Sequence, residues 1–324
     1  MSDIQLKDVL KFEHSFCVLP FIHQHIDTKQ RQRVCCHSTT EITPERLIGI
    51  QQDMLANLPV PECSTCTKCE QQKQFSFRQT ETRDWFRNYP KLCQDAIKNP
   101  VVISYDLRYS NNCNLRCQMC DAESSSEWAR YIGKEVFQTW DPDSITINPD
   151  AKKIYFAGGE PFMIKSFSQV LNSIENTDCE IQVNTNATIL TEHLLSALER
   201  FRDVTFILSI DGTGSTIEKI RTLCDWNIIQ KNIDTLRHRL SPKFMVNTVL
   251  QKDNLDNIPE LANWIDSKEI SIWHAEILTR PEQFYFKNYA SKLQWPESLW
   301  ENACVQKNMQ VYKNLKFIES NLAA

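Results

Sequence analysis

From about residue 100 onward, the chain alternates short apolar runs, rich in β-branched and aromatic residues, with segments of helical character. The six β-rich runs cover 101–107, 153–161, 180–187, 203–212, 243–250 and 269–278. Helix-like stretches, including 121–133, 164–176, 191–201 and 226–240, lie between them. Strands separated by helices at this spacing form parallel α/β sheets, either open or curled into a barrel. The alternation therefore predicts a parallel sheet that binds its ligands at the carboxyl ends of the strands.

The rest of the 324 residues divides around this alternation. Residues 1–98 lack it, so we expect a separate, small, cysteine-rich α+β unit there. Residues 99–281 are expected to form the sheet with its helices. Residues 282–324 are expected to be a helical extension that ends in a helix over 303–322.

Charge and hydropathy argue against a membrane protein, a secreted protein and a protein with a broad nucleic-acid-binding face. No apolar run approaches the ~20 residues of a membrane helix, and the N-terminus lacks the basic start and apolar stretch of a secretory signal. A net charge of −5, from 36 basic and 41 acidic residues, gives no sign of a broad basic face for nucleic acid. We therefore expect a cytoplasmic protein that contacts no membrane, and the charge disfavours a nucleic-acid partner, although a local basic groove is compatible with it.

The thirteen cysteines point to metal binding, because a chain without an export signal keeps its thiols reduced. Six of them fall in the first seventy residues: Cys17, Cys35, Cys36, Cys63, Cys66 and Cys69. Three more share one eight-residue window, namely Cys113, Cys117 and Cys120. The four single cysteines are expected to be small buried apolar residues: Cys93, Cys179, Cys224 and Cys304.

The eight-residue window has the spacing C-x3-C-x2-C and follows the first predicted strand of the sheet. Thiolates at this spacing can bind three irons of a [4Fe–4S] cluster and leave the fourth iron without a protein ligand. A metal site with an open position usually performs chemistry. The alternative is a zinc site that takes its fourth ligand from elsewhere in the chain.

Polar residues and glycines gather after the other predicted strands. Four of the six glycines occupy two strand-end turns, Gly158-Gly159 and Gly212-Thr213-Gly214. In so glycine-poor a chain, these positions suggest positive φ angles or close backbone approach to a ligand, with ordinary loop geometry as the alternative. Side chains two apart on a strand share a face. Three such pairs are Ser209 with Asp211, Asn184 with Asn186, and His274 with Glu276, the last pair expected to be structural.

The cysteine window, the GGEP segment at 158–161 and the SxDG segment at 209–212 lie at the ends of the first, second and fourth predicted strands, in this order. Together they resemble the radical S-adenosylmethionine (SAM) superfamily. The resemblance implies a partial (β/α)6 TIM-like barrel with a SAM-binding [4Fe–4S] cluster on Cys113, Cys117 and Cys120. In that family, an electron from the cluster cleaves SAM to methionine and a 5′-deoxyadenosyl radical, which abstracts a substrate hydrogen.

The same resemblance implies roles for single residues. Gly158, Gly159, Glu160 and Pro161 would receive the SAM amino group, and Ser209 and Asp211 would lie near the SAM ribose and the substrate. Asn186 belongs to a TN signature that the family shares, and Asn247 is a further candidate for the ribose or carboxylate. Met119 stands where the family usually has an aromatic residue near adenine, and a methionine can fill that apolar role. Asp211 and Glu160 are the candidate catalytic groups.

The N-terminal cysteines suggest a second metal site. Two short strands around a polar turn would bring Cys17 and Cys35 together, and Cys63-x2-Cys66 would complete four thiolates, with Cys36 and Cys69 in reserve. Thiolates suit a fully ligated Fe–S cluster or zinc, and the spacing does not separate the two.

This layout resembles the twitch/SPASM auxiliary-cluster module of radical SAM enzymes, and the run CNLRCQMCDAESSSEW resembles the twitch-domain-containing subgroup. The stretch from Cys63 to Arg78 matches that subgroup's C-x2-C-x3-E…S-x-R pattern through Glu70 and Ser76. Two features depart from the module. Gln30 stands where the hairpin normally carries a glycine, and the module here precedes the barrel.

These features predict a radical SAM enzyme with an auxiliary [4Fe–4S] cluster, or zinc as the alternative metal. By resemblance, the enzyme would oxidise or crosslink a peptide or a small polar metabolite, with a flavodoxin or ferredoxin as electron donor. One alternative is a radical SAM enzyme that modifies RNA or a nucleoside. The other is a non-catalytic Fe–S or zinc scaffold that binds a partner.

Overall fold

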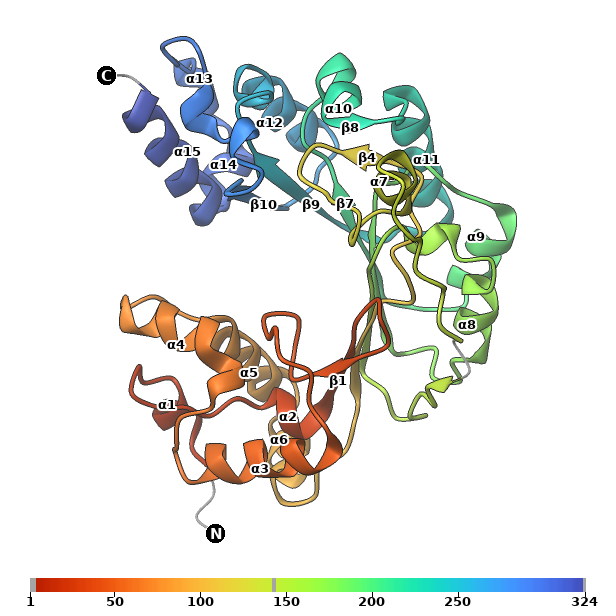
Figure 1. Ribbon diagram of the computed structural model, residues 1–324, viewed down its shortest axis with the longest axis vertical. Helices are drawn as coiled ribbons and strands as arrows, with labels where there is room; N and C mark the ends of the chain where they lie inside the picture. Colours follow the sequence, from red (N-terminus) through yellow and green to blue (C-terminus); the bar gives the residue numbers. More distant parts are fainter. Residues whose placement is uncertain (1–3, 142–143, 323–324) are drawn as a thin grey trace.

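The computed structural model describes residues 4–141 and 144–322, and these residues form one large curved sheet (Figure 1). The strand order is β10–β9–β7–β6–β5–β3–β1–β2, and neighbours are parallel except for the antiparallel pair β1–β2. The strands are β1 (His23–Ile26), β2 (Gln32–Arg33), β3 (Ser104–Leu107), β5 (Lys153–Phe156), β6 (Glu180–Thr185), β7 (Val204–Ser209), β9 (Lys243–Leu250) and β10 (Ile272–Ile277). Within the described residues β10 and β2 are the two edges, so the barrel is incomplete. The mostly parallel sheet confirms the predicted α/β class.

Each of the six predicted β-rich runs contains one strand, and these strands lie side by side in sequence order from β3 to β10. Burial alternates along β6, where Ile181 and Val183 are fully buried while Gln182 and Asn184 are partly exposed. Because successive side chains point to opposite faces, the apolar residues pack on one face and the amides lie on the other. The sequence pattern thus builds a sheet with one helix-covered face and one polar face.

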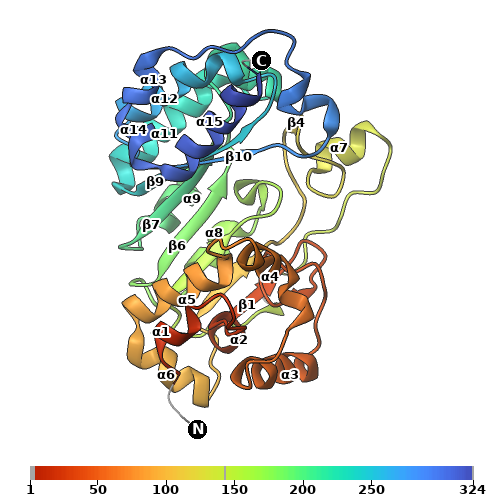
Figure 2. The ribbon, with the colours of Figure 1, turned by 90° about the vertical axis from the view of Figure 1, so that its left-hand side faces the viewer.

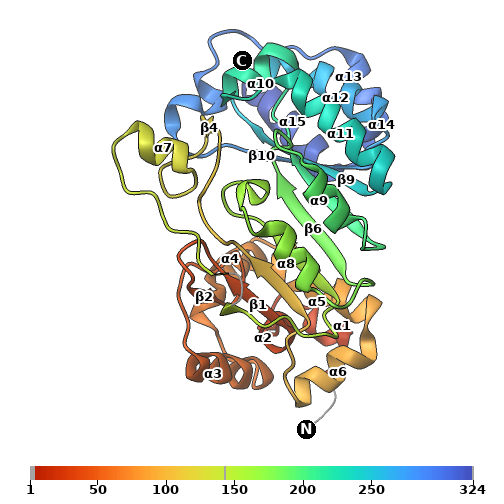
Figure 3. The same cartoon turned by 90° about the vertical axis from the view of Figure 1, so that its right-hand side faces the viewer.

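Helices cover the convex face of the sheet (Figure 3). They are α8 (Phe167–Ser173), α9 (Glu192–Leu198), α10 (Gly214–Ile220), α11 (Trp226–Leu240) and α12 (Ile258–Ser267). Short 3-10 helices connect other elements: η1 (Pro61–Cys63), η3 (Pro161–Met163), η4 (Leu255–Asn257), η5 (Glu282–Phe284) and η6 (Phe286–Asn288). None of the helices that the structure describes is long and apolar enough to cross a membrane.

Local side-chain caps set where several of these helices begin. Thr191 Oγ1 accepts a hydrogen bond from Leu194 N, so α9 starts at the predicted position. Asp225 caps α11 in the same way. The helix predicted over 121–133 is shorter, because Ser125 is the cap and α7 spans only Ser126–Tyr131.

The N-terminal residues have an apolar core of their own, yet they share the main sheet. Their helices are α1 (Leu6–Val9), α2 (Leu19–Ile22), α3 (Pro44–Leu55), α4 (Ser64–Gln71), α5 (Phe77–Asn88) and α6 (Pro90–Lys98). Strand β1 pairs in parallel with β3, which extends the sheet beyond the six predicted strands. Figure 2 shows these helices around β1 at the bottom of the view and the C-terminal helices near β10 at the top, with β6 and β7 between the two groups. The sequence analysis did not anticipate this shared sheet, and the domain division at residue 98 stays a prediction.

The turn between β1 and β2 explains why the related modules carry glycine at the position of Gln30. Gln30 has a φ angle of 59°, in the left-handed region that glycine adopts most easily. Asp27 stabilises the turn by accepting hydrogen bonds from Lys29 N and Arg31 N. Gln30 therefore adopts the backbone conformation that glycine would have, and its side chain makes this conformation more strained than it would be for glycine.

The C-terminal residues cover the edge strand β10. They contain α13 (Glu297–Glu301), α14 (Ala303–Lys307) and α15 (Met309–Leu322). The predicted helix over 303–322 is interrupted at Asn308, whose Oδ1 accepts a hydrogen bond from Trp273 N on β10 at 3.0 Å. From α15, Asn314 Nδ2 donates to Ala275 O at 2.7 Å. Two asparagine side chains thus satisfy backbone groups that an edge strand would otherwise present to another chain.

We expect Asn314→Ala to lower the free energy of unfolding by about 1–3 kcal/mol, because it leaves the buried carbonyl of Ala275 without its donor. Urea denaturation measures the change. Asn321→Ala is the matched control, since this exposed side chain bonds to Phe317 O within its own helix. Equal stabilities for the two variants would contradict the role of Asn314.

Candidate functional site

The three-cysteine loop follows β3 at the carboxyl end of the sheet. Cys113 and Cys117 are buried and Cys120 is partly buried, and Leu115 and Met119 pack among them. Among the described residues, no three His, Cys, Asp or Glu side chains converge on the position of one metal ion. The thiolates of a [4Fe–4S] cluster bind different irons, so they surround a volume instead of a point. Three soft thiolates on one loop fit such a cluster with one open iron.

The residues that follow the cysteines hold this loop in place. Ser126 Oγ accepts a hydrogen bond from Cys113 N at 3.0 Å, and Trp128 Nε1 donates to Cys117 O at 2.8 Å. Ser125 caps α7, the helix that carries both partners. The hydroxyl residues and tryptophan in the run after the cysteines therefore fix the conformation of the loop.

The two glycines of the GGEP segment allow one backbone to touch another. Gly158 has a φ angle of 117°, and a Cβ atom on Gly159 would lie 2.2 Å from the carbonyl oxygen of Asn112. Gly159 N donates to Ser110 O at 2.9 Å, and Glu160 N donates to Asn112 O at 2.7 Å. The close approach that the glycine count suggested is thus to the segment that leads into the cysteine loop.

Glu160 is fully engaged by neighbouring donors. Its carboxylate accepts hydrogen bonds from Thr185 Oγ1 at 2.8 Å and from the backbone nitrogens of Asn186 at 2.7 Å and Phe162 at 3.2 Å. Burial raises the pKa of Glu160 to about 7, against the opposing effect of these donors. This carboxylate joins the end of β5 to the end of β6, and Pro161 beside it begins η3 in a buried position.

Asn186 lies between β6 and the cysteine loop. Its Nδ2 is 4.0 Å from Cys113 Sγ and donates to Asn114 Oδ1 at 3.1 Å. Its Oδ1 accepts from the backbone and hydroxyl of Thr188. The TN signature is therefore in direct contact with the first cysteine of the window.

Asp211 is fully buried and forms an ion pair that the sequence analysis missed. Arg221 Nε lies 2.8 Å from Asp211 Oδ2, and Arg221 Nη1 donates to Cys117 Sγ at 3.7 Å. Hydrogen bonding to Cys120, together with the nearby Arg221 charge, lowers the pKa of Cys117, whereas burial raises that of Cys113 to about 12. Arg221 belongs to the two-residue strand β8 (Arg221–Thr222), too short to leave a periodic pattern in the sequence.

In the N-terminal unit, the four predicted ligands lie near one another. Cys17, Cys35, Cys63 and Cys66 are buried free thiols. Burial raises the pKa of Cys17 well above its usual value, and the charges of Cys63 and Cys35 raise it further. The reserve thiol Cys69 points elsewhere, since its Sγ donates to Phe75 O at 3.5 Å. The chemistry of four neighbouring thiols suits an Fe–S cluster or zinc.

A buried ion pair explains the C-x2-C-x3-E…S-x-R pattern. Arg78 Nε donates to Glu70 Oε1 at 2.8 Å, Arg78 Nη2 contacts Glu70 Oε2, and Ser76 Oγ donates to the same carboxylate. Glu70 lies on α4 with Cys66, and Arg78 lies on α5, where its Nη1 donates to Ser15 O at 3.1 Å. The pattern therefore joins the helix of the second cysteine pair to the segment before Cys17.

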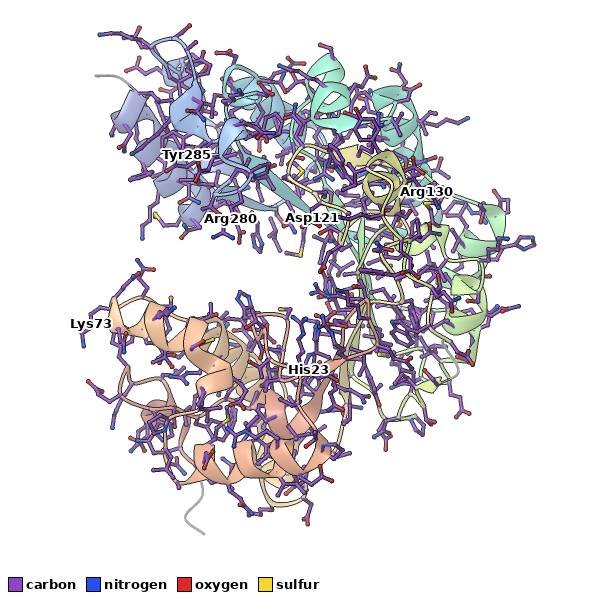
Figure 4. All side chains as sticks on the ribbon, viewed as in Figure 1. His23, Lys73, Asp121, Arg130, Arg280 and Tyr285 are labelled. Carbon is purple, nitrogen blue, oxygen red and sulfur yellow. The ribbon has the colours of Figure 1, made fainter. Side chains whose placement is uncertain are left out.

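A cavity of about 310 Å³ lies between the N-terminal unit and the polar face of the sheet. From the unit it is lined by Leu19, His23, Cys35, Cys36, His37, Phe77 and Glu81, and from the sheet by Ser104, Tyr105, Asp106, Arg108, Lys153, Tyr155, Gln182, Ile207 and Asn247. Asp106 pairs with Arg108 Nε at 3.0 Å and with His25 Nδ1 at 2.9 Å. Figure 4 places His23 on the inner side of the unit, with Asp121 and Arg280 across the open side of the molecule.

A family model described as the radical SAM superfamily matches residues 107–265. These residues belong to the radical SAM superfamily. Membership implies SAM and a [4Fe–4S] cluster as cofactors, and the match covers the cysteine loop and the strand ends from β5 to β9.

Two curated proteins are similar to this chain over part of their length. The tungsten-containing aldehyde ferredoxin oxidoreductase cofactor-modifying protein of Pyrococcus furiosus is 26% identical over 49% of this chain and 47% of its own. The GTP 3′,8-cyclase of Psychromonas ingrahamii is 23% identical over 62% of this chain and 61% of its own. A solved structure, native anSMEcpe with bound AdoMet, has a TM-score of 0.44 and 14% identity, and the match covers 66% of this chain and 59% of that one. This chain therefore spans about half to three fifths of the lengths of these proteins.

The other predicted site residues differ in how deeply they are buried and in what they contact. Ser209 Oγ donates to Asn184 Oδ1 at 3.4 Å at the ends of β7 and β6. Asn247 Oδ1 is buried without a partner among the described residues, and the side chain lines the cavity. His274 and Glu276 are exposed on β10.

Of the single cysteines, Cys93, Cys179 and Cys304 are buried as predicted. Cys224 is partly exposed and packs against the cysteine loop. Its position corrects the expectation that all four would be buried.

We expect Gly159→Ala to reduce iron incorporation and to destabilise the chain by about 1–3 kcal/mol, because the new methyl group displaces the backbone before Cys113. Iron content and thermal unfolding measure both effects. In the control variant Gly49→Ala, the nearest heavy atom to the new Cβ is the flexible end of Arg46, at 3.3 Å. Full iron content in Gly159→Ala would show that the backbone contact is dispensable.

Proposed function

We propose that this chain is a radical SAM enzyme that cleaves SAM reductively and abstracts a hydrogen atom from its substrate. Cys113, Cys117 and Cys120 would hold the cluster. The observation that carries the proposal is this loop of three thiols, fixed by the GGE backbone and by β8 at the carboxyl end of the sheet. When bound, the cluster and SAM supply a one-electron reductant and a carbon-centred radical.

The chain's own residues would bind and orient SAM. We assign the backbone of Gly158 to Pro161 to the amino group, and Asn186 to a position beside the first cysteine. Ser209, at the end of β7, and Asn247, opposite it in the middle of β9, would offer hydrogen-bonding partners to a ribose or carboxylate on the polar face. Met119 offers an apolar contact for adenine.

Glu160 and Asp211 act in this proposal by positioning other groups. Both carboxylates are buried and already accept hydrogen bonds or an ion pair from their own chain. Glu160 fixes the TN segment, and Asp211 fixes Arg221. In this proposal the two residues, expected from the sequence to be catalytic, instead orient the other residues of the site.

We propose that Cys17, Cys35, Cys63 and Cys66 hold an auxiliary [4Fe–4S] cluster. Four thiolates leave no open iron, so electron transfer is the function that suits this site. Cys35 also lines the cavity, which brings the site next to the space proposed for substrate. Oxidation or crosslinking of a substrate radical releases one electron, and a cluster at these thiols is the acceptor that we propose.

The proposed substrate is a peptide or a small polar metabolite bound in the cavity between the N-terminal unit and the sheet. The supporting feature is its lining of charged and hydrogen-bonding side chains, among them Arg108, Lys153 and Gln182. A flavodoxin or ferredoxin is the proposed electron donor. Thirteen free thiols, all within the described residues, suit a reducing cytoplasmic compartment.

Cys117→Ser is expected to abolish release of 5′-deoxyadenosine when SAM is added to the reduced, reconstituted protein, because serine removes one of three cluster ligands. Chromatography of the quenched mixture measures the product. Cys224→Ser is the control, since Cys224 packs against the same loop without being a proposed ligand. Undiminished release from Cys117→Ser would overturn the proposed function.

The double variant Cys63→Ala/Cys66→Ala is expected to lower iron and sulfide from about eight to about four atoms per chain, as loss of one of two [4Fe–4S] clusters requires. Cys93→Ala, in the same apolar core, is the control and should keep the wild-type content. A wild-type protein with about four irons and one zinc would overturn the auxiliary cluster and identify a zinc site.

A further inference from the structure

The contacts of Arg221 place a cation between a proposed cluster ligand and a buried carboxylate. Strand β8 pairs antiparallel with β4 (Arg116–Cys117), and in this register Arg221 lies directly opposite Cys117. The Arg221 side chain is 11% exposed and that of Asp211 is 0% exposed. Water therefore screens this arrangement poorly.

We propose that Arg221 and Asp211 set the reduction potential of the SAM-binding cluster, with the arginine raising it and the aspartate lowering it. The inference rests on the proposed function, because it assumes a [4Fe–4S] cluster on Cys113, Cys117 and Cys120. It assigns to both residues a positioning and tuning role that is separate from contact with SAM or substrate.

The sign follows from the charge that the cluster gains. Reduction by a flavodoxin or ferredoxin transfers one electron from the donor, and the cluster becomes more negative by one unit. A nearby cation stabilises the reduced form more than the oxidised form, and a nearby anion does the opposite. Donors to the cluster sulfurs and the net charge around them are known determinants of such potentials. Arg221, which donates to Cys117 Sγ, provides both effects.

Asp211 makes the burial of this arginine possible and fixes its direction. One oxygen pairs with Arg221 Nε, while the other accepts a hydrogen bond from Val249 N at 2.7 Å. Asn254 Nδ2 donates to the carbonyl of Asp211 at 2.8 Å. The carboxylate is thus tied to β9, and the guanidinium lies between the carboxylate and the Cys117 thiol, in contact with both.

A purely structural role is the competing explanation. In that case the pair only fastens β8, and with it the cysteine loop, to the sheet. Removing either partner would then impair folding or cluster assembly, but it would not shift the potential of the assembled cluster in a direction set by the charge removed. The two explanations therefore differ in a measurable sign.

The test compares Arg221→Gln, Asp211→Asn and Lys219→Gln in the full chain, reconstituted with iron and sulfide and titrated without SAM. Electron paramagnetic resonance follows the reduced cluster and gives the midpoint potential. We expect Arg221→Gln to shift the reduction equilibrium at least tenfold toward the oxidised cluster, a change of about −59 mV for one electron. Asp211→Asn should shift it in the opposite direction. Lys219→Gln should leave it unchanged, because that cation is 62% exposed and pairs with Asp253.

The double variant Arg221→Gln/Asp211→Asn keeps the test decisive if a single variant fails to fold with its charge unpaired. Both replacements are neutral, so the double variant buries no isolated charge. We expect its potential to be lower than that of the wild type, because the lost donor contacts the thiol directly. An unshifted double variant, or single variants that shift in the same direction, would overturn the inference. A wild-type protein that assembles no cluster at this loop would instead overturn the proposed function.

Discussion

The candidate site depends on a contact between two backbones that only glycine permits. Gly159 lies so close to Asn112 that any side chain would meet its carbonyl oxygen at 2.2 Å. The next residue, Glu160, bonds to the backbone of Asn186, whose side chain reaches Cys113. An irregular loop thereby acquires a fixed position, because each neighbour that holds it is itself held by a strand of the sheet. Apolar packing builds the sheet, but buried polar contacts place the cysteines.

The other side of the cysteine loop is held by strand pairing and by a buried ion pair. The pairing of β4 with β8 brings Arg221 opposite Cys117, and Asp211 holds the guanidinium from the end of β7. A buried arginine is tolerable only with such a partner, because an unpaired charge in the interior is strongly destabilising. Position and electrostatics are therefore coupled here, since the residue that closes the loop is also a cation in contact with a proposed ligand.

Much of the fold could be predicted from the sequence, because periodic patterns report on burial. The six β-rich runs, the cap at Thr191 and the strand-end motifs all leave local signals. The shared sheet and Arg221 could not be predicted in this way. Strand β8 has only two residues, too few to show a period, and the pairing of β1 with β3 joins segments about eighty residues apart, which no local pattern reports. The role of Gly159 could be predicted only in part. The small number of glycines in the chain predicted a close backbone approach at this position, but it did not identify the segment that is approached.

The position of the N-terminal unit before the barrel follows from the two edges of the sheet. At one edge, β10 is covered by α15, and asparagine side chains already satisfy the backbone at Trp273 and Ala275. At the other edge, β3 is free to pair with a preceding strand, and β1 occupies that place. The N-terminal unit joins the sheet at this β3 side, where the pairing of β1 with β3 holds it. Because the sheet runs through both parts, Cys35 and Arg108 line one cavity whose two walls are joined by strand pairing.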